Sequence, residues 1–166
     1  MTAATRIALA GLACAVSCAL AAPASAQTLA RKDISVDAAV IIATTAMADC
    51  KAKGWPVSVA VVGRAGELLV HLRGDGTGPH TMDNSFRKAY TSRTTRQPSG
   101  KLAERLKADP QLSLVTLPNM VAGQGALPIM IGEEVVGAAG ASGAPGGEKD
   151  EACIQTGLDK IKDQLK

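Results

Sequence analysis

The chain has few aromatic residues, and this scarcity limits what it can bind. Its 166 residues include one Trp, one Phe and one Tyr, namely Trp55, Phe86 and Tyr90. Single-stranded nucleic acids are held by stacking their bases on aromatic side chains, and this chain offers no such platform. Its formal net charge of +3 is also too small to indicate a nucleic-acid partner. We therefore expect no nucleic-acid binding, and a core built from Ala, Val, Ile, Leu and Met.

Motifs for catalysis and for metal binding are also missing. The two histidines, His71 and His80, do not form the His-Glu-x-x-His spacing of a zinc site, and no Cys-x-x-Cys-His run would attach haem covalently. The segment around Ser142 resembles the Gly-x-Ser-x-Gly nucleophile elbow, but its fifth residue is Ala144. No Gly-Lys-Ser/Thr follows the glycines before Lys149, so a phosphate-binding loop is absent. We predict no catalytic residue.

Residues 1–26 have the pattern of a secretory signal peptide. Arg6 is followed by an apolar run from Ile7 to Ala22 and by the small-residue cleavage site Ala24-Ser25-Ala26. The alternatives are an N-terminal anchor helix and a lipoprotein, although no Leu stands three residues before either cysteine of this segment. We expect a periplasmic or secreted protein with no membrane span after removal of the signal, folded as one domain over residues 27–166.

Two cysteines, Cys50 and Cys153, remain after the predicted cleavage. An even number of cysteines in an oxidising compartment favours a disulfide. If the first and last helices pack side by side, this bond would tie the two ends of the domain together. Two separate buried thiols are the alternative, and a catalytic thiol is disfavoured because no histidine lies close in sequence to either cysteine.

Hydrophobic periodicity predicts an α+β fold. Helices are expected over Val36–Lys53, His80–Arg96, Ser99–Lys107 and Glu148–Leu165. Strands are expected over Val57–Gly63, Glu67–Arg73, Leu127–Ile131 and Glu134–Ala141. Residues 111–118 fit either a helical turn or the lead-in to a strand. The first helix should face the core with Val36, Ala39, Val40, Ala43, Ala46, Met47 and Cys50, and the second with Met82, Phe86 and Tyr90. This order predicts an antiparallel sheet of about five strands covered by helices.

A glycine-rich loop runs from Gly140 to Gly147 and leads into an acidic helix start at Glu148. Such a loop has almost no side chains, so backbone N–H groups near a helix N-terminus can lie against a ligand or a neighbouring subunit. A flexible connector is the alternative. The acidic residues already complement this helix end and disfavour an anion there.

The same region carries a family resemblance. The matching segments are Gly78-Pro79-His80-Thr81, Lys88-Ala89-Tyr90-Thr91, Gly125-Ala126-Leu127-Pro128-Ile129, Val135 to Ala144, and Asp150-Glu151-Ala152-Cys153. They resemble the signature of the GlcG/HbpS-like haem-binding family, which includes the C-terminal domain of PduO-type proteins. The resemblance covers roughly residues 34–158. It implies a profilin-like arrangement, assembly into homo-oligomers and haem as a cofactor.

Candidate ligand-binding residues follow from the resemblance and from local chemistry. His80 stands beside a Gly-rich loop at a helix start, as a haem-iron ligand could; an exposed loop histidine is the alternative. Arg73 and Lys88 are candidate partners for acidic groups of the ligand. The second and third predicted helices carry a surplus of basic residues, which would attract an anion or form only a solvated face. Glycine-loop residues Gly143, Pro145 and Gly146 are the expected pocket wall.

These observations predict an exported small-molecule-binding protein. We expect it to hold haem, or a related tetrapyrrole such as a corrinoid, non-covalently as a homo-oligomer. The alternatives are an enzyme acting on a small organic acid or a peroxide, and a sensory or assembly module.

Overall fold

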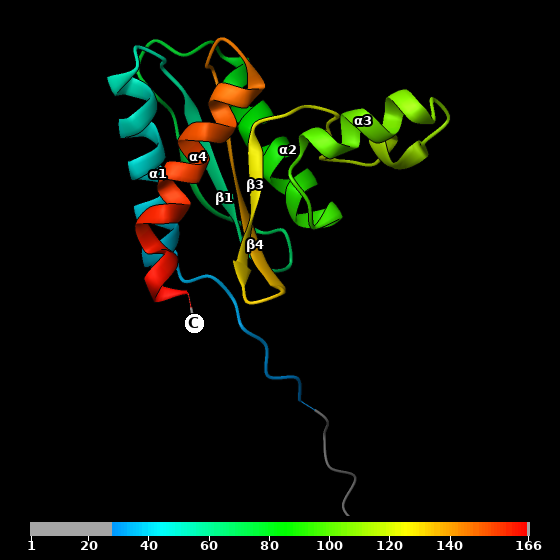
Figure 1. The fold of residues 1–166 in the computed structure, drawn as a ribbon, viewed down its shortest axis with the longest axis horizontal. Coiled ribbons are helices and arrows are strands. Elements are labelled where there is room, and N and C mark those ends of the chain that lie inside the picture. The colour runs from blue at the N-terminus through cyan, green and yellow to red at the C-terminus, as the bar shows by residue number, and fades with distance from the viewer. Residues whose placement is uncertain (1–27, 166) are drawn as a thin grey trace, which may run out of the picture. The chain divides into compact units, whose positions relative to one another are not determined.

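The computed structural model describes residues 28–165, and Figure 1 shows their arrangement. The predicted signal peptide, residues 1–26, lies outside the described residues. The folded unit begins at Lys32. Among residues 28–165, no helix is both long and apolar enough to cross a membrane.

Four α-helices and four β-strands form the fold, with boundaries near those expected. In chain order they are α1 (Val36–Ala52), β1 (Ser58–Val62), β2 (Leu68–Leu72), α2 (His80–Thr95), α3 (Gly100–Ala108), β3 (Ala126–Ile131), β4 (Glu134–Ser142) and α4 (Gly147–Ile161). Two short 3₁₀ helices, η1 (Ser113–Thr116) and η2 (Lys162–Gln164), complete the described part of the chain. The expected N-cap of α1 is confirmed, because the Ser35 hydroxyl accepts a hydrogen bond from the Ala38 amide at 3.2 Å.

The strands form one antiparallel sheet in the order β2-β1-β4-β3. The antiparallel α+β fold is confirmed, but the sheet of the described residues has four strands instead of about five. The ambiguous segment 111–118 forms η1. Pro110 and Pro118 bound this segment, and proline cannot donate the backbone hydrogen bond that a ladder requires.

One face of the sheet packs on α1 and α4, as Figure 1 shows. The buried residues of α1 are Ala39, Ile42, Ala43, Ala46 and Cys50. The prediction was wrong for Val36 and Val40, which are exposed. Every residue from 38 to 43 is apolar, so periodicity alone did not distinguish the face that packs. Cys50 and Cys153 form the predicted disulfide between α1 and α4.

Helix α2 covers the other face of the sheet with small and polar side chains. Its buried residues are Thr81, Ser85, Lys88, Ala89, Thr91 and Ser92. Met82, Phe86 and Tyr90, which we expected in the core, are only partly buried. The helix backbone comes close to β4 at Gly140, where an added Cβ would lie 2.6 Å from the Ser85 carbonyl oxygen. This close approach leaves no room for large side chains between helix and sheet.

Candidate functional site

A cleft of about 340 Å³ lies where the N-terminus of α2, the C-terminal end of β4 and the N-terminus of α4 meet. This volume is within the usual range of small-molecule pockets. The cleft brings together four residues predicted from the sequence, which come from segments far apart in the chain: His80, Lys88, Gly143 and Gly146. Pro145 and Arg73 are not among the residues that line it.

Hydroxyl groups form one wall of the cleft. The Ser58 hydroxyl lies 2.8 Å from the Thr81 hydroxyl and 3.5 Å from the Thr77 hydroxyl. Thr81 also donates to the Gly78 carbonyl at 2.8 Å, and Asn84 donates to the Ser142 hydroxyl at 3.0 Å. These bonds link β1 and β4 to the loop and helix that carry His80. The wall is therefore polar and held in place by internal hydrogen bonds.

The floor of the cleft contains a buried ion pair between Lys88 and Asp150. The Lys88 Nζ donates to Asp150 Oδ2 at 2.8 Å and to the Ala141 carbonyl at 3.1 Å. The two side chains are only 7% and 4% exposed. The second carboxylate oxygen, Oδ1, accepts a hydrogen bond from the Ala144 amide at 3.0 Å. This pair joins α2, β4 and α4, and it fixes the start of the glycine-rich loop.

The glycine-rich loop approaches the segment before β1. Gly143 has φ +134°, and an added Cβ would lie 2.4 Å from the Pro56 carbonyl oxygen. Both its backbone conformation and its close contact therefore require glycine. Gly146 lines the cleft beside it, whereas Pro145 is exposed outside the lining.

The two histidines have different environments. His71 Nε2 lies 2.9 Å from the Met82 carbonyl oxygen and 3.2 Å from the Ser85 hydroxyl, so this ring joins β2 to α2. His80 is exposed at the cleft, and its ring lies beside Gly78. Only His80 therefore offers an imidazole nitrogen to a ligand in this cleft.

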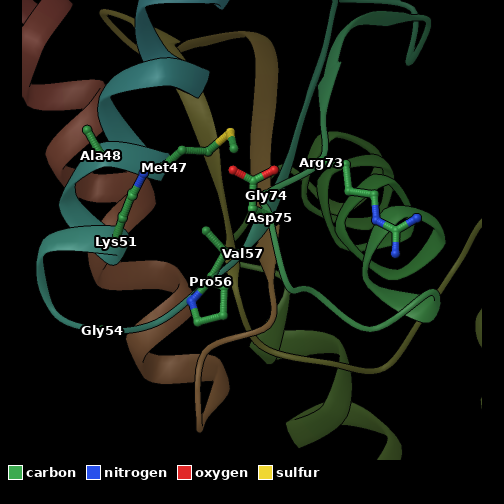
Figure 2. Close-up of a pocket in the computed structure, with 9 residues that line it drawn as sticks. All are labelled: Met47, Ala48, Lys51, Gly54, Pro56, Val57, Arg73, Gly74 and Asp75. Atoms are coloured by element: carbon green, nitrogen blue, oxygen red, sulfur yellow. The ribbon is translucent and has the colours of Figure 1, made fainter.

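Arg73 lies in a second cavity, of about 360 Å³, drawn in Figure 2. Its guanidinium donates to the Thr77 carbonyl at 3.1 Å and to the Thr77 hydroxyl at 3.4 Å. Figure 2 shows the Arg73 side chain extending away from Met47 and Lys51. Arg73 thus holds the 74–78 loop and reaches the first cleft only through Thr77.

The two cavities differ in the groups that line them. His80 offers a nitrogen of the kind that binds haem iron, but the walls of its cleft are mainly hydroxyl and amide groups. The second cavity has an apolar lining from Met47, Ala48 and Pro56. Pro56 lines both cavities. One cavity therefore offers a nitrogen donor, and the other offers an apolar wall.

No group of three or more His, Cys, Asp or Glu side chains within residues 28–165 could hold a metal ion. The carboxylate of Asp150 is engaged by Lys88 and by a backbone amide. His80 is thus the exposed imidazole that the cleft offers to a ligand.

Sequence reasoning missed several lining residues. Thr77, Thr81 and Asn84 were not predicted as part of the site, and Asp150 was named in the acidic helix start and in a family-like segment but not as a binding residue. A signal was present in α2, where Thr81, Ser85, Lys88 and Ser92 recur at helical spacing. A helix with a small polar face and one lysine on it indicates a buried polar network.

Comparisons with known proteins found similar sequences and structures. A family model described as "Haem degrading protein HbpS-like" matches residues 34–159. The chain is also 32% identical over 107 residues to an uncharacterized 15.0 kDa protein in the dhaT-dhaS intergenic region of Citrobacter freundii, covering 63% of this chain and 75% of that protein.

Solved structures share the fold. A double mutant of HbpS from Streptomyces reticuli is 35% identical with a TM-score of 0.78, and the match covers 85% of this chain and 97% of that chain. The structure of a PduOC:heme complex has a TM-score of 0.71 at 19% identity, covering 77% of this chain and 94% of that chain. At that identity, the second likeness shows a common fold alone.

Proposed function

This chain belongs to the HbpS-like family, and from that premise we propose that it binds haem, or a related tetrapyrrole, without a covalent bond. The observation that carries the proposal is the family match over residues 34–159, which includes every residue of the His80 cleft. We assign His80 as the iron ligand. The Gly143 and Gly146 backbone and the hydroxyl wall would contact the edge of the ligand.

The position of His80 supports this assignment. The 74–78 loop before it is held by Arg73 through Thr77, and the hydroxyl of Thr81 fixes the first turn of α2. An imidazole on a fixed helix start needs little reordering on binding, which favours affinity. Lys51 and Arg73 of the neighbouring cavity are the cations available to acidic groups of the ligand.

Haemin titration tests the proposal. We expect the purified protein to give a shifted Soret band that saturates at stoichiometric haem. The His80→Ala variant should move the position of the band and weaken binding about tenfold or more, because one axial ligand is lost. Thr94→Ala is the matched control, since Thr94 is exposed at the far end of the same helix.

Two outcomes distinguish the identity of the ligand from the assignment of His80 as its iron ligand. If the unaltered protein gives no shifted band at stoichiometric haem, haem is not the ligand. If His80→Ala keeps both the band position and the affinity, only the assignment of His80 is wrong, and a donor of the neighbouring cavity becomes the candidate.

Haem degradation is the second candidate function, because the description of the matching family names it. It would make this chain an enzyme instead of a carrier. Bound haem should be incubated with and without peroxide while the Soret band is recorded. Loss of the band with the protein, faster than for free haem, favours degradation; a stable band favours binding alone.

Export and assembly belong to the same proposal. The signal-peptide pattern and the Cys50–Cys153 disulfide support a periplasmic or secreted protein. The family resemblance supports a homo-oligomer and a profilin-like arrangement. The mass of the exported chain tests export, and we expect a product that begins at Gln27. The mass of the particle in solution tests assembly, and we expect several times the mass of one chain.

A further inference from the structure

Three arginines from two separate elements line another cavity, of about 500 Å³. Arg64 lies in the turn between β1 and β2, whereas Arg93 and Arg96 come from the C-terminal end of α2. Helix α2 is 16 residues long, so this cavity lies about 20 Å along the helix from His80. Figure 1 shows α2 running beside the sheet. The arginine cavity is thus separate from the His80 cleft.

The carboxylates near this cavity do not neutralise all three arginines. Two carboxylates, Glu133 and Glu134, also line the cavity. Glu134 pairs with Arg64 at 2.6 Å, and Asp33 accepts a hydrogen bond from the Arg64 amide at 3.0 Å. In contrast, no ion pair within residues 28–165 includes Arg93 or Arg96. The cavity therefore keeps two guanidinium groups without a carboxylate partner in the described part of the chain.

Arg93 is the most constrained of the three. Its Nε is buried and has no hydrogen-bond partner among the described residues. Burial, followed by the charges of Arg64 and Arg96, lowers the pKa of Arg93, and Asp33 and Glu67 oppose this to a smaller extent. An arginine stays charged in proteins, so the side chain bears both the repulsion and the unmet donor. A negatively charged group that accepts a hydrogen bond from Arg93 would relieve both.

Arg96 stands where a helix end usually has glycine. Its backbone is left-handed, with φ +58°, and its amide caps α2 by donating to the Ser92 carbonyl. A non-glycine residue in this conformation is strained. The negative end of the helix dipole favours basic residues here. The dipole does not explain why Arg64, from another element, lines the same cavity.

We propose that Arg64, Arg93 and Arg96 form a second binding site, for a small multivalent oxyanion. Guanidinium groups donate two parallel hydrogen bonds to a carboxylate or a phosphate, and three of them enclose a group with several oxygens. Arg93 and Arg96 would contact the anion directly. Arg64 would add charge while remaining paired with Glu134.

Calorimetric titration of the full folded chain tests the site. The probes are inorganic phosphate and succinate, with chloride at the same ionic strength as the reference. We expect saturable binding of at least one oxyanion, weakened about tenfold or more in Arg96→Ala. Arg93→Lys keeps the charge but loses the paired donors. Its affinity for the oxyanion should therefore lie between that of the unaltered protein and that of Arg96→Ala. Arg105→Ala, an exposed change on α3, should bind as the unaltered protein does.

The probes also identify the chemistry of the ligand. Binding of phosphate alone assigns a phosphoryl ligand, and binding of succinate alone assigns a dicarboxylate. The proposal is overturned if neither binds more tightly than chloride, or if Arg96→Ala leaves binding unchanged. It is also overturned if Arg96→Ala alters only the particle mass in solution, because the arginines would then lie between copies of the chain. The haem Soret band should not respond to the oxyanion, which keeps this test independent of haem binding.

Discussion

At the scale of single residues, the buried pair of Lys88 and Asp150 is the most consequential contact of the candidate site. Asp150→Asn leaves the ammonium group without its anion in a buried position. Loss of one partner of a buried ion pair costs about 3 kcal/mol or more. We expect the free energy of unfolding, measured by urea denaturation, to fall by about that amount.

A double variant distinguishes the loss of the Lys88–Asp150 ion pair from a general disturbance of the packing around it. Lys88→Met together with Asp150→Asn removes both charges, so it should lose less stability than the sum of the two single variants. Additive losses would show that the pair does not couple. Glu104→Gln, in the exposed Lys101–Glu104 pair, is the control, and it should change the free energy of unfolding by less than about 0.5 kcal/mol.

This pair also shows what the sequence could not predict at the residue scale. Lys88 was predicted as a free cation for acidic groups of the ligand, whereas in the structure it pairs with Asp150. Its partner Asp150 lies 62 residues away in the chain. Nothing in local spacing links an acidic residue in the first turn of one helix to a lysine on another, so only the packed fold could reveal their contact.

At the scale of elements, the contact between α2 and β4 depends on one glycine. In Gly140→Ala, the new Cβ would meet the Ser85 carbonyl oxygen at 2.6 Å and the Ala89 amide nitrogen at 2.8 Å. These are backbone atoms, so the helix must move away from the strand. We expect the free energy of unfolding to fall by roughly 1–3 kcal/mol, as for other overpacked sites. Chemical denaturation measures this change.

Gly123→Ala is the matched control for that variant. Its added Cβ would have only ordinary contacts, at 3.8 and 3.9 Å. A similar loss of stability in both variants would contradict the close approach of α2 to β4. If instead only Gly140→Ala is affected, haem and oxyanion titrations of that variant would show whether both ends of α2 have shifted.

Element boundaries were predicted well because caps and turns are local. Ser35 starts α1, and the Gly132-Glu133 pair joins β3 to β4 as expected. The buried faces were harder to predict. In α1 every residue from 38 to 43 is apolar, and in α2 the buried face consists mainly of small or polar residues, some of them beside Gly140. The face of each helix that becomes buried depends on the sheet and helices that pack against it, and these come from distant parts of the sequence.

At the scale of the whole molecule, the sequence predicted the antiparallel α+β class, the family and the disulfide. It did not predict that Arg73 would lie in a cavity apart from His80. Both residues flank the 74–78 loop, and only the path of that loop decides which cavity each one faces. The distribution of the predicted residues over two cavities therefore depends on tertiary structure.

The Cys50–Cys153 disulfide acts on the molecule as a whole, because it closes a loop with a sequence separation of 103 residues. On the chain-entropy model, such a crosslink stabilises the fold by about 4.7 kcal/mol, since it restricts the unfolded chain. We expect a reductant to lower the melting temperature by roughly 15 °C. The Cys50→Ala/Cys153→Ala variant should melt at this lower temperature with or without reductant. Equal melting temperatures for the oxidised and reduced protein would contradict a crosslink across the domain. A reduced protein that still binds haem would show further that the disulfide stabilises the fold without shaping the site.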